Sequence, residues 1–264
     1  MLQLINFGDQ MERTKLIWLK KPKCAGTSFE TALRELGCIY YVDQDTCLAD
    51  LNNPLHKVIC VRSGCGPNGK TWKKSSDGSY EIVYSSGIKS TLKRIFKQPF
   101  EPVKFMLANF PDFFHSHKKF AILRNPFDKF VSSWKFLEST RNMDIKDLLE
   151  HLPDKIAFMD WLHITKTQHD CLFDHNGNSI CDYYVYMELD LNEQLNKMLL
   201  YAGIDEIKLP HKRKSARSHC AEHLEESSIA AILQIYRQDF DDFGYSPNIE
   251  TLAPELPNHQ LQIT

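Results

Sequence analysis

The sequence predicts an α/β fold with a mainly parallel central sheet. Apolar runs of strand length alternate along the chain with segments whose apolar residues recur at helical spacing. Two of these runs, at 16–19 and 118–124, lead through a short turn directly into such a helix. Units of this kind build parallel sheets, because the helix carries the chain back to the edge where the next strand begins.

Each predicted element rests on a local pattern. The strand "KLIWLKK" (15–21) is followed by "SFETALREL" (28–36), which has apolar residues at helical spacing and Gly37 as a stop signal. Further strands are predicted at 57–62 and 118–124, and the latter runs into a proline and a helix with an apolar face. The remaining predictions are a hairpin around Asp77-Gly78, two strands around Asn176-Gly177 within 171–188, and helices at about 145–151, 155–167, 190–202 and 222–240.

The composition is that of an ordinary globular protein. With 264 residues, of which 42% are hydrophobic, the chain can bury a sizeable core, and a net charge of −2 gives no general attraction to nucleic acid. No apolar run approaches the ~18 residues of a membrane helix, and residues 1–12 lack the features of a signal peptide. The eight cysteines are dispersed and include no CxxC pair, so we expect neither a disulfide framework nor a zinc site. These features favour a cytoplasmic protein without a membrane or nucleic-acid partner, although a trimmed secretory-pathway domain would share them.

The turn "KKPKCAGTS" (20–28), between the first strand and its helix, has the composition of an anion site. Small residues let backbone N–H groups approach an anion, and the N-terminus of the helix favours negative charge there. Thr27 and Ser28 add hydroxyl donors, and Lys23 adds a mobile cation. The alternative is a turn that only caps the helix. A Walker A loop is excluded, because the pattern G-x-x-x-x-G-K-[ST] is absent.

A second turn, within "ILRNPFDKFVSSW" (122–134), repeats the arrangement. Arg124 stands at the carboxyl end of its strand, and Ser132 lies eight residues later, about two turns into the next helix. An arginine binds a phosphate monoester bidentately, and a hydroxyl can add a further hydrogen bond. The alternative is that Arg124 pairs with Asp128 while Ser132 faces solvent.

Taken together, "PKCAGTS" and "RNPFDKFVSSW" resemble the two cofactor motifs of sulfotransferases that use 3′-phosphoadenylyl sulfate (PAPS). They look most like those of the carbohydrate-type family that includes the heparan 2-O and chondroitin 4-O sulfotransferases and bacterial relatives. The resemblance implies that the first motif holds the 5′-phosphosulfate and the second the 3′-phosphate. The cofactor-binding residues that it implies in these motifs are Lys21, Lys23, Cys24, Ala25, Gly26, Thr27, Ser28, Arg124 and Ser132.

The resemblance extends beyond the two motifs, over residues 15–246. "CLFDHNGNSICDYYVYMELDLNEQLNKML" is similar to a family segment that ends in an acidic residue before a helix, here Glu188, and "IYRQDFDDFGYS" resembles the family's closing helix. "LPHKRKSARSHC" resembles a basic loop near the cofactor, which implies phosphate contacts from Lys214, Ser215 and Arg217.

The resemblance also sets the expected organisation of the chain. It implies a P-loop-like three-layer domain. We therefore expect one domain over 1–264, with a core at about 15–246 and an inserted surface region at 63–95. Contacts with the acceptor are expected within 40–110, which contains the poorest match to the family, so the acceptor stays open.

The implied reaction is the in-line transfer of a sulfuryl group from PAPS to a hydroxyl, an N-hydroxyl or an amine of a saccharide or small metabolite. Lys23, which matches the family's motif lysine, is expected to neutralise charge on the leaving oxygen. The family commonly supplies a base between the two motifs, but this sequence departs from the pattern there and has Gln98. His56 and Glu30 are the candidates for the base, and no metal is expected.

Two other classes of protein share part of this pattern. A P-loop-type kinase has the same strand–loop–helix unit, but it needs the full Walker loop and a carboxylate for magnesium. A non-catalytic module that binds an adenine nucleotide or a sulfated ligand keeps both motifs and needs no base. The oligomeric state stays open as well.

Overall fold

The computed structural model describes most of the chain between residues 15 and 255. The described residues are 15–21, 23–43, 45–62, 70–74, 80–84, 102–141, 167–174, 176–209, 224–251 and 253–255. The strands are β1 (Leu16–Lys20), β2 (Ile39–Tyr41), β3 (Val58–Arg62), β4 (Lys70–Lys74), β5 (Tyr80–Tyr84), β6 (Lys118–Leu123) and β7 (Tyr183–Tyr186). The helices are α1 (Gly26–Glu35), α2 (Leu48–Asn52), α4 (Pro102–Asn109), α5 (Pro111–Ser116), α6 (Pro126–Arg141), α10 (His169–Leu172), α11 (Leu191–Tyr201), α12 (Glu226–Ile235) and α13 (Arg237–Phe243).

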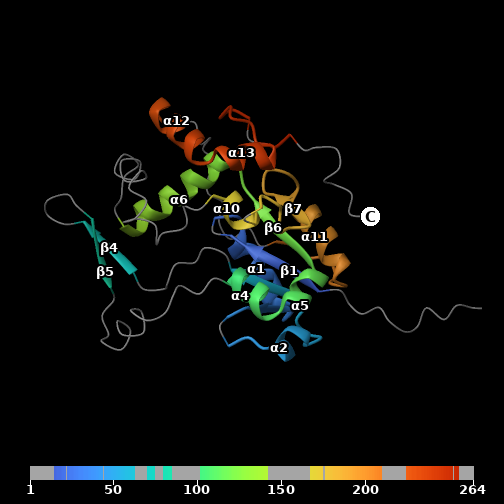
Figure 1. Cartoon of the computed structure of the whole chain (residues 1–264). Coiled ribbons are helices and arrows are strands. Elements are labelled where there is room, and N and C mark those ends of the chain that lie inside the picture. The colour runs from blue at the N-terminus through green and yellow to red at the C-terminus, as the bar shows by residue number, and fades with distance from the viewer. Residues whose placement is uncertain are drawn as a thin grey trace, which may run out of the picture.

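Five of these strands form a parallel sheet in the order β2-β3-β1-β6-β7 (Figure 1). β1 lies in the middle, with Leu16 in register with Val58 of β3 on one side and with Lys118 of β6 on the other. Because the strands are parallel, the carboxyl ends of β1 and β6 lie at the same edge of the sheet. The two turns predicted to bind anions leave β1 and β6 at that edge, so the sheet brings them together.

Helices cover both faces of the sheet, which gives three layers. Along β1 the side chains alternate, so that Ile17 and Leu19 belong to one buried cluster and Leu16 and Trp18 to the other. The first cluster includes residues of α4, α5, α6, α12 and α13, and the second includes residues of α1 and α11. Phe29 of α1 packs edge-on against Trp18 with ring centroids 4.8 Å apart, and burying each such ring contributes roughly 1.5–3 kcal/mol. The predicted α/β fold, with a parallel central sheet flanked by helices, is confirmed.

Most predicted elements occur at their predicted places. The strands expected at 57–62 and 118–124 are β3 and β6, and the helix expected at 190–202 is α11. The hairpin predicted around Asp77-Gly78 corresponds to β4 and β5, which pair antiparallel and form a two-stranded sheet of their own. The predicted strand–turn–helix units at β1 and β6 are both present.

Helix α1 ends at the predicted stop. Gly37 has a φ of +64°, a left-handed conformation that glycine adopts without a steric penalty. The turn is closed by the N–H of Cys38, which donates to the carbonyl of Leu33 at 3.2 Å. The chain then enters β2 next to β3.

The prediction of two strands within 171–188 is wrong for its first half. The chain forms the short helix α10, and Phe173 and Ser179 form only an isolated antiparallel bridge across the turn at Asn176-Gly177. The second half is the strand β7, which pairs in parallel with β6. The hairpin has only this bridge among the described residues, because residues 183–186 form their backbone hydrogen bonds with β6 instead.

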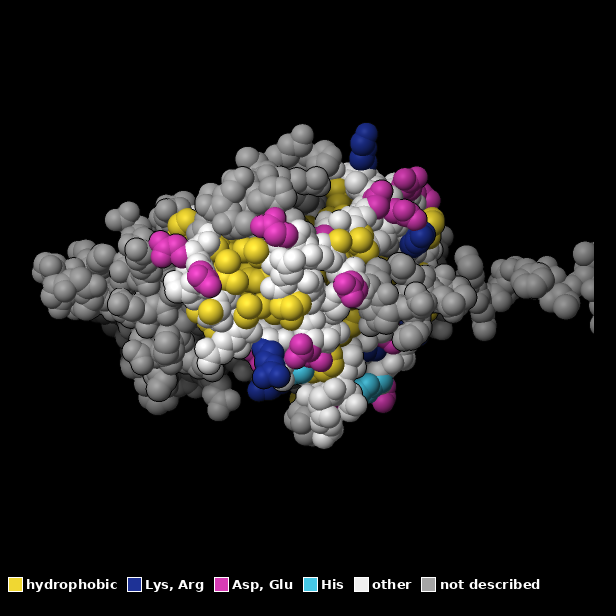
Figure 2. All heavy atoms as spheres, turned by 90° about the horizontal axis from the view of Figure 1, so that it is seen from above, with side chains coloured by type: hydrophobic (Ala, Val, Ile, Leu, Met, Phe, Trp, Pro, Cys, Tyr) yellow, Lys and Arg dark blue, Asp and Glu magenta, His cyan; other side chains and the backbone are white. Residues whose placement is uncertain are grey.

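The helix predicted at 222–240 is divided into α12 and α13. Tyr236 separates them with a φ of −102° and a ψ of 20°, and its side chain is fully buried. The break lets α12 pack on α6 while α13 packs on α10. Partly buried Ile229 and Leu233 of α12 pack against the first cluster. Figure 2 looks from above onto the side of the molecule where α12 and α13 lie, and shows hydrophobic side chains gathered there with acidic ones around them.

Two further predicted helices, at 145–151 and 155–167, lie outside the described residues. Among the helices that are described, none combines the length and the apolar character needed to cross a bilayer.

Candidate active site

The turn between β1 and α1 has a strained backbone. Lys23 and Ala25 have positive φ angles of +65° and +45°, in the left-handed region that costs non-glycine residues about 1–2 kcal/mol each. Such strain persists only where surrounding contacts hold the chain, and it is concentrated at functional sites. One of these contacts comes from Arg124, whose Nη1 donates to the carbonyl of Lys23 at 3.2 Å.

The first turn of α1 presents backbone donors. Within the part of the chain that the structure describes, no acceptor takes the N–H groups of Gly26 and Thr27. The helix dipole adds a partial positive charge at this end. A Cβ atom on Gly26 would lie 2.9 Å from Cε of Lys20, so glycine lets the helix begin against the lysine stem. Thr27 is exposed and Ser28 is half-buried, so this end of the helix combines N–H groups and hydroxyls that an anion can accept from.

The turn between β6 and α6 is anchored by the buried Asn125. Its Oδ1 accepts from the N–H of Phe127 at 3.0 Å, and its own N–H donates to Oε1 of Glu188 at 2.6 Å. Glu188 also accepts from the hydroxyl of Tyr245 at 3.0 Å. Burial raises the pKa of Glu188, while these hydrogen bonds and the charge of Arg124 act in the opposite direction. The acidic residue singled out in the sequence therefore fixes the backbone of this turn.

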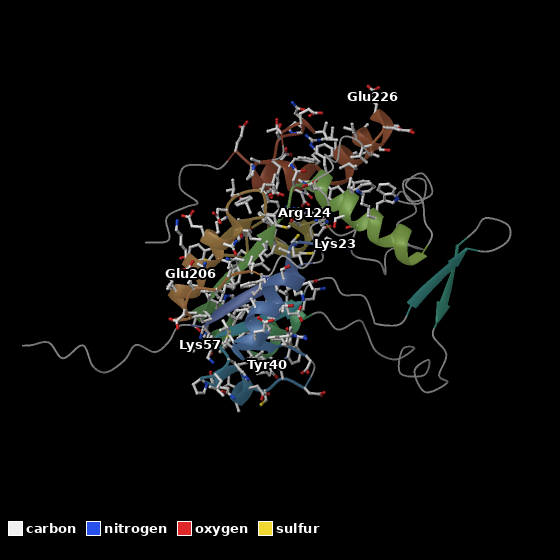
Figure 3. All side chains as sticks on the ribbon, turned by 180° about the vertical axis from the view of Figure 1, so that it is seen from behind. Lys23, Tyr40, Lys57, Arg124, Glu206 and Glu226 are labelled. Atoms are coloured by element: carbon white, nitrogen blue, oxygen red, sulfur yellow. The ribbon has the colours of Figure 1, made fainter. Side chains whose placement is uncertain are left out.

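The two turns meet at Lys23 and Arg124. Figure 3 shows both side chains in the same part of the molecule, and the hydrogen bond between them joins residues that are 101 positions apart. Among the described residues Arg124 makes no ion pair with Asp128, so that alternative for the arginine is not observed. The arginine instead links the second turn to the first.

The two lysines that precede Lys23 have their own partners. Lys20 forms an ion pair with Glu30 of α1. Lys21 is buried, and its Nζ donates to the backbone carbonyl of Gln168 at 2.8 Å. Lys21 therefore stabilises the turn through its positive charge and its hydrogen bond. Lys23 is more exposed than Lys21.

Cys24 lies in the middle of the charged groups of the site. Burial raises the pKa of its thiol to about 11, while nearby Lys129, Lys21 and Arg124 lower it and Glu188 raises it. The thiol therefore stays protonated at neutral pH, and it serves as a small buried group rather than as a nucleophile. The three cations that act on it show that positive charge converges on this turn.

The remaining predicted contacts are placed in part. Ser132 lies half-buried on α6, the helix that begins at the second turn. Lys214, Ser215 and Arg217 lie outside the described residues, so their phosphate contacts stay predictions.

Glu30 is fixed in a network that argues against a role as the base. Its carboxylate pairs with Lys20 and with Arg34, at 2.7 Å for the latter, and accepts from the hydroxyl of Tyr41 at 2.7 Å. Burial raises the pKa of Tyr41 to about 12, so the phenol keeps its proton and remains a donor. With three donors on its two oxygens, Glu30 stabilises the packing of α1 on β1 and β2.

His56 lies at the wrong end of the sheet. It precedes β3, and its Nδ1 is 2.7 Å from the carbonyl oxygen of Asp50 while its ring stacks on Tyr40. The five residues of β3 separate it from the carboxyl edge, a distance of about 17 Å at ~3.3 Å per residue. The geometry therefore argues against His56 as the base.

The sequence interpretation missed Gln168. Its fully buried side chain lies between the two turns, where its Oε1 accepts from the N–H of Arg124 at 2.9 Å and lies 3.6 Å from Sγ of Cys24. The segment "KTQHD" carries no periodicity or motif, so nothing local marks this glutamine. Among the described residues, no three His, Cys, Asp or Glu side chains are arranged to hold a metal ion.

Comparisons with known proteins identify the family. No curated protein matches the chain. A crystal structure of a sulfotransferase from Alicyclobacillus acidocaldarius is similar at 13% identity with a TM-score of 0.40, and the match covers 85% of this chain and 96% of that one. The model of the sulfotransferase family matches residues 10–246, which includes both turns and nearly all of the described chain. The chain therefore belongs to the sulfotransferase family.

Proposed function

We propose that this sulfotransferase takes its sulfuryl group from PAPS and transfers it to a hydroxyl, an N-hydroxyl or an amine of a saccharide or small metabolite. The observation that carries the proposal is the contact between the two turns, in which Arg124 donates to the carbonyl of Lys23 at 3.2 Å. A donor with a phosphosulfate and a separate phosphate needs two anion sites close together. The two turns offer such a pair at one edge of the sheet.

The residues of the first turn suit the phosphosulfate end of PAPS. The N–H groups of Gly26 and Thr27 and the hydroxyls of Thr27 and Ser28 can donate to its oxygens, and Lys23 supplies a positive charge. Arg124 and Ser132 are assigned to the 3′-phosphate, because a guanidinium binds a phosphate monoester with two parallel hydrogen bonds.

In the proposed mechanism the acceptor attacks sulfur in line with the bond to the leaving phosphate. When PAPS is bound, it supplies an activated sulfuryl group. The protein orients the acceptor and neutralises the charge that develops on the bridging oxygen. Lys23 is the cation assigned to that oxygen, since it matches the family's motif lysine and is more exposed than the buried Lys21. An acceptor that loses its proton easily, such as an N-hydroxyl, lessens the need for a strong base.

The test is to incubate the protein with PAPS and a panel of saccharides, phenols, amines and N-hydroxyl compounds, and to measure release of adenosine 3′,5′-bisphosphate. We expect acceptor-dependent release, with a sulfated product of the corresponding mass. Tight binding of the nucleotide without turnover on any acceptor would favour the non-catalytic binding module. Turnover of ATP with magnesium, and none of PAPS, would favour a kinase and contradict the proposal.

A further inference from the structure

The side chain of Gln168 forms hydrogen bonds with both backbone groups of Arg124 in the second turn. Its side-chain Oε1 accepts from the N–H of Arg124 at 2.9 Å, and its Nε2 donates to the carbonyl of the same residue at 2.9 Å. Arg124 follows the last residue of β6, so the amide takes the place that a neighbouring strand would occupy. Gln168 is fully buried, so water does not compete for these two hydrogen bonds.

The same residue also contacts the first turn. Its backbone carbonyl accepts from Nζ of Lys21 at 2.8 Å, and its Oε1 lies 3.6 Å from Sγ of Cys24, within hydrogen-bonding distance for sulfur. Lys21 and Cys24 flank the strained Lys23 in sequence. One glutamine therefore contacts both of the turns that we assign to the nucleotide.

Gln168 is itself held in place by a buried carboxylate. Asp239 of α13 accepts from the N–H of Gln168 at 2.8 Å with one oxygen and from the N–H of His169 at 2.7 Å with the other. Asp239 is fully buried. Burial lowers the pKa of the nearby buried Lys129, and the negative charge of Asp239 partly offsets this effect. The start of α10 is thus fixed to α13, and the glutamine has little freedom to move.

We propose that Gln168 is a positioning residue for the nucleotide site: it fixes the backbone of Arg124 so that the guanidinium faces the first turn, and thereby couples the two turns. The proposal rests on the proposed use of PAPS. A primary amide both donates and accepts in one plane, as the backbone of Arg124 requires. Glutamate lacks the donor and methionine lacks both groups. Coupling the turns in advance lowers the cost of ordering them around a ligand with two anionic ends.

The chain offers a matched control in Gln194. Its Nε2 donates to the carbonyl of Tyr186 at 2.9 Å, and its Oε1 accepts from the N–H of Tyr186 at 2.9 Å, which is the same arrangement at the end of β7. Gln194→Met therefore removes the same two kinds of hydrogen bond from the same sheet without touching Arg124.

The experiment compares Gln168→Met with Gln194→Met. Calorimetry measures binding of adenosine 3′,5′-bisphosphate and of 5′-AMP, and the ratio of the two dissociation constants reports on the 3′-phosphate alone. We expect Gln168→Met to reduce this ratio about fivefold or more and Gln194→Met to leave it within about twofold. In an Arg124→Ala background, Gln168→Met should reduce the ratio no further, because the glutamine acts through the arginine.

Gln168→Leu serves as a second variant if the methionine variant does not fold, since leucine also removes both hydrogen bonds and adds no charge to the buried position. It should lower the ratio in the same direction. Equal weakening of both nucleotides, or an effect that adds in full to that of Arg124→Ala, would show that Gln168 is only structural and overturn the proposal.

A second readout needs no nucleotide. NMR hydrogen exchange at the amide of Arg124 should be faster in Gln168→Met than in Gln194→Met, and equal rates would overturn the proposal. If the unmodified protein shows no preference for adenosine 3′,5′-bisphosphate, the proposed use of PAPS fails. The exchange rate at Arg124 then still decides whether Gln168 holds this backbone.

Discussion

Arg124 donates a hydrogen bond to the backbone carbonyl of Lys23, a residue that precedes it by 101 positions. The bond uses one of the five N–H donors of the guanidinium, and within the described part of the chain the others have no protein acceptor. Arg124 can therefore hold the first turn and bind an anion at the same time. This contact joins the two turns that we assign to the nucleotide.

Replacement of Lys23 by alanine tests the assignment of the leaving-group cation. If Lys23 neutralises the bridging oxygen, kcat should fall by about 10² or more, because one electrostatic stabiliser of the transition state is lost. The measurement is turnover at saturating PAPS. Lys197→Ala is the control, since that exposed lysine on α11 pairs, among the described residues, only with Glu193 one turn away and should keep full activity. A Lys23→Ala variant that retains most of its kcat would remove Lys23 from the chemistry.

Replacement of Arg124 by alanine tests the assignment of the 3′-phosphate. A charge-assisted bidentate contact is worth about 1.5–3 kcal/mol, so binding of adenosine 3′,5′-bisphosphate should weaken at least about tenfold more than binding of 5′-AMP. Calorimetry on both nucleotides gives the two losses. Arg237→Ala is a control, because Arg237 is exposed on α13 and its one ion pair within the described part of the chain is with Asp241. Equal losses for the two nucleotides would mean that Arg124 has a purely structural role.

Local patterns predicted the elements that depend on local chemistry. The apolar runs gave β1, β3 and β6, and Gly37 marked the end of α1 because its left-handed conformation is intrinsic to glycine. Elements decided by distant contacts were predicted less well. The hairpin expected at 171–188 was replaced by pairing with β6, and the last helix breaks at the buried Tyr236. Neither event has a cause within its own segment.

The same division applies to the site. The two turns could be found because small residues, lysines and an arginine at strand ends form a local pattern. The roles of Glu30 and His56 could not be decided from the sequence. The role of Glu30 depends on distant partners such as Tyr41 of β2. The role of His56 depends on the end of the sheet at which its loop lies. Gln168 was missed because its contacts with the two turns are made with residues at least 44 positions away in the sequence.

The thiol of Cys24 should resist alkylation in the folded protein. Its pKa of about 11 leaves only ~0.1% thiolate at pH 8, and the side chain is buried. Cys47 is exposed and serves as an internal control. Iodoacetamide at pH 8 followed by peptide mass mapping should find Cys47 modified first and Cys24 modified only in urea. Comparable rates at both positions would contradict the buried environment of the first turn.

The thiol of Cys24 should also make the folded protein less stable at alkaline pH. The unfolded thiol ionises near pH 9, whereas the folded one keeps its proton to about 11. Between these values the folded state binds more protons, so the contribution of Cys24 to the free energy of unfolding falls as the pH rises. In Cys24→Ala this part of the alkaline decline should disappear, which urea titrations between pH 8 and 11 can measure. An unchanged decline would place the thiol in contact with solvent.

Replacement of Asp239 by asparagine tests whether the carboxylate holds the start of α10. The two N–H groups of Gln168 and His169 each use one carboxylate oxygen, at 2.8 and 2.7 Å, and an amide offers only one. One buried N–H is then left without an acceptor, so the free energy of unfolding should fall by about 1–3 kcal/mol, as measured by urea denaturation. Asp241→Asn on the same helix is the control, because its exposed side chain pairs, as far as the described residues go, only with Arg237 one turn away and its loss should cost under ~0.5 kcal/mol. If the two variants lose the same small amount, Asp239 is not the anchor. If Asp239→Asn alone is destabilised and its affinity for adenosine 3′,5′-bisphosphate falls with it, the carboxylate supports the nucleotide site through Gln168.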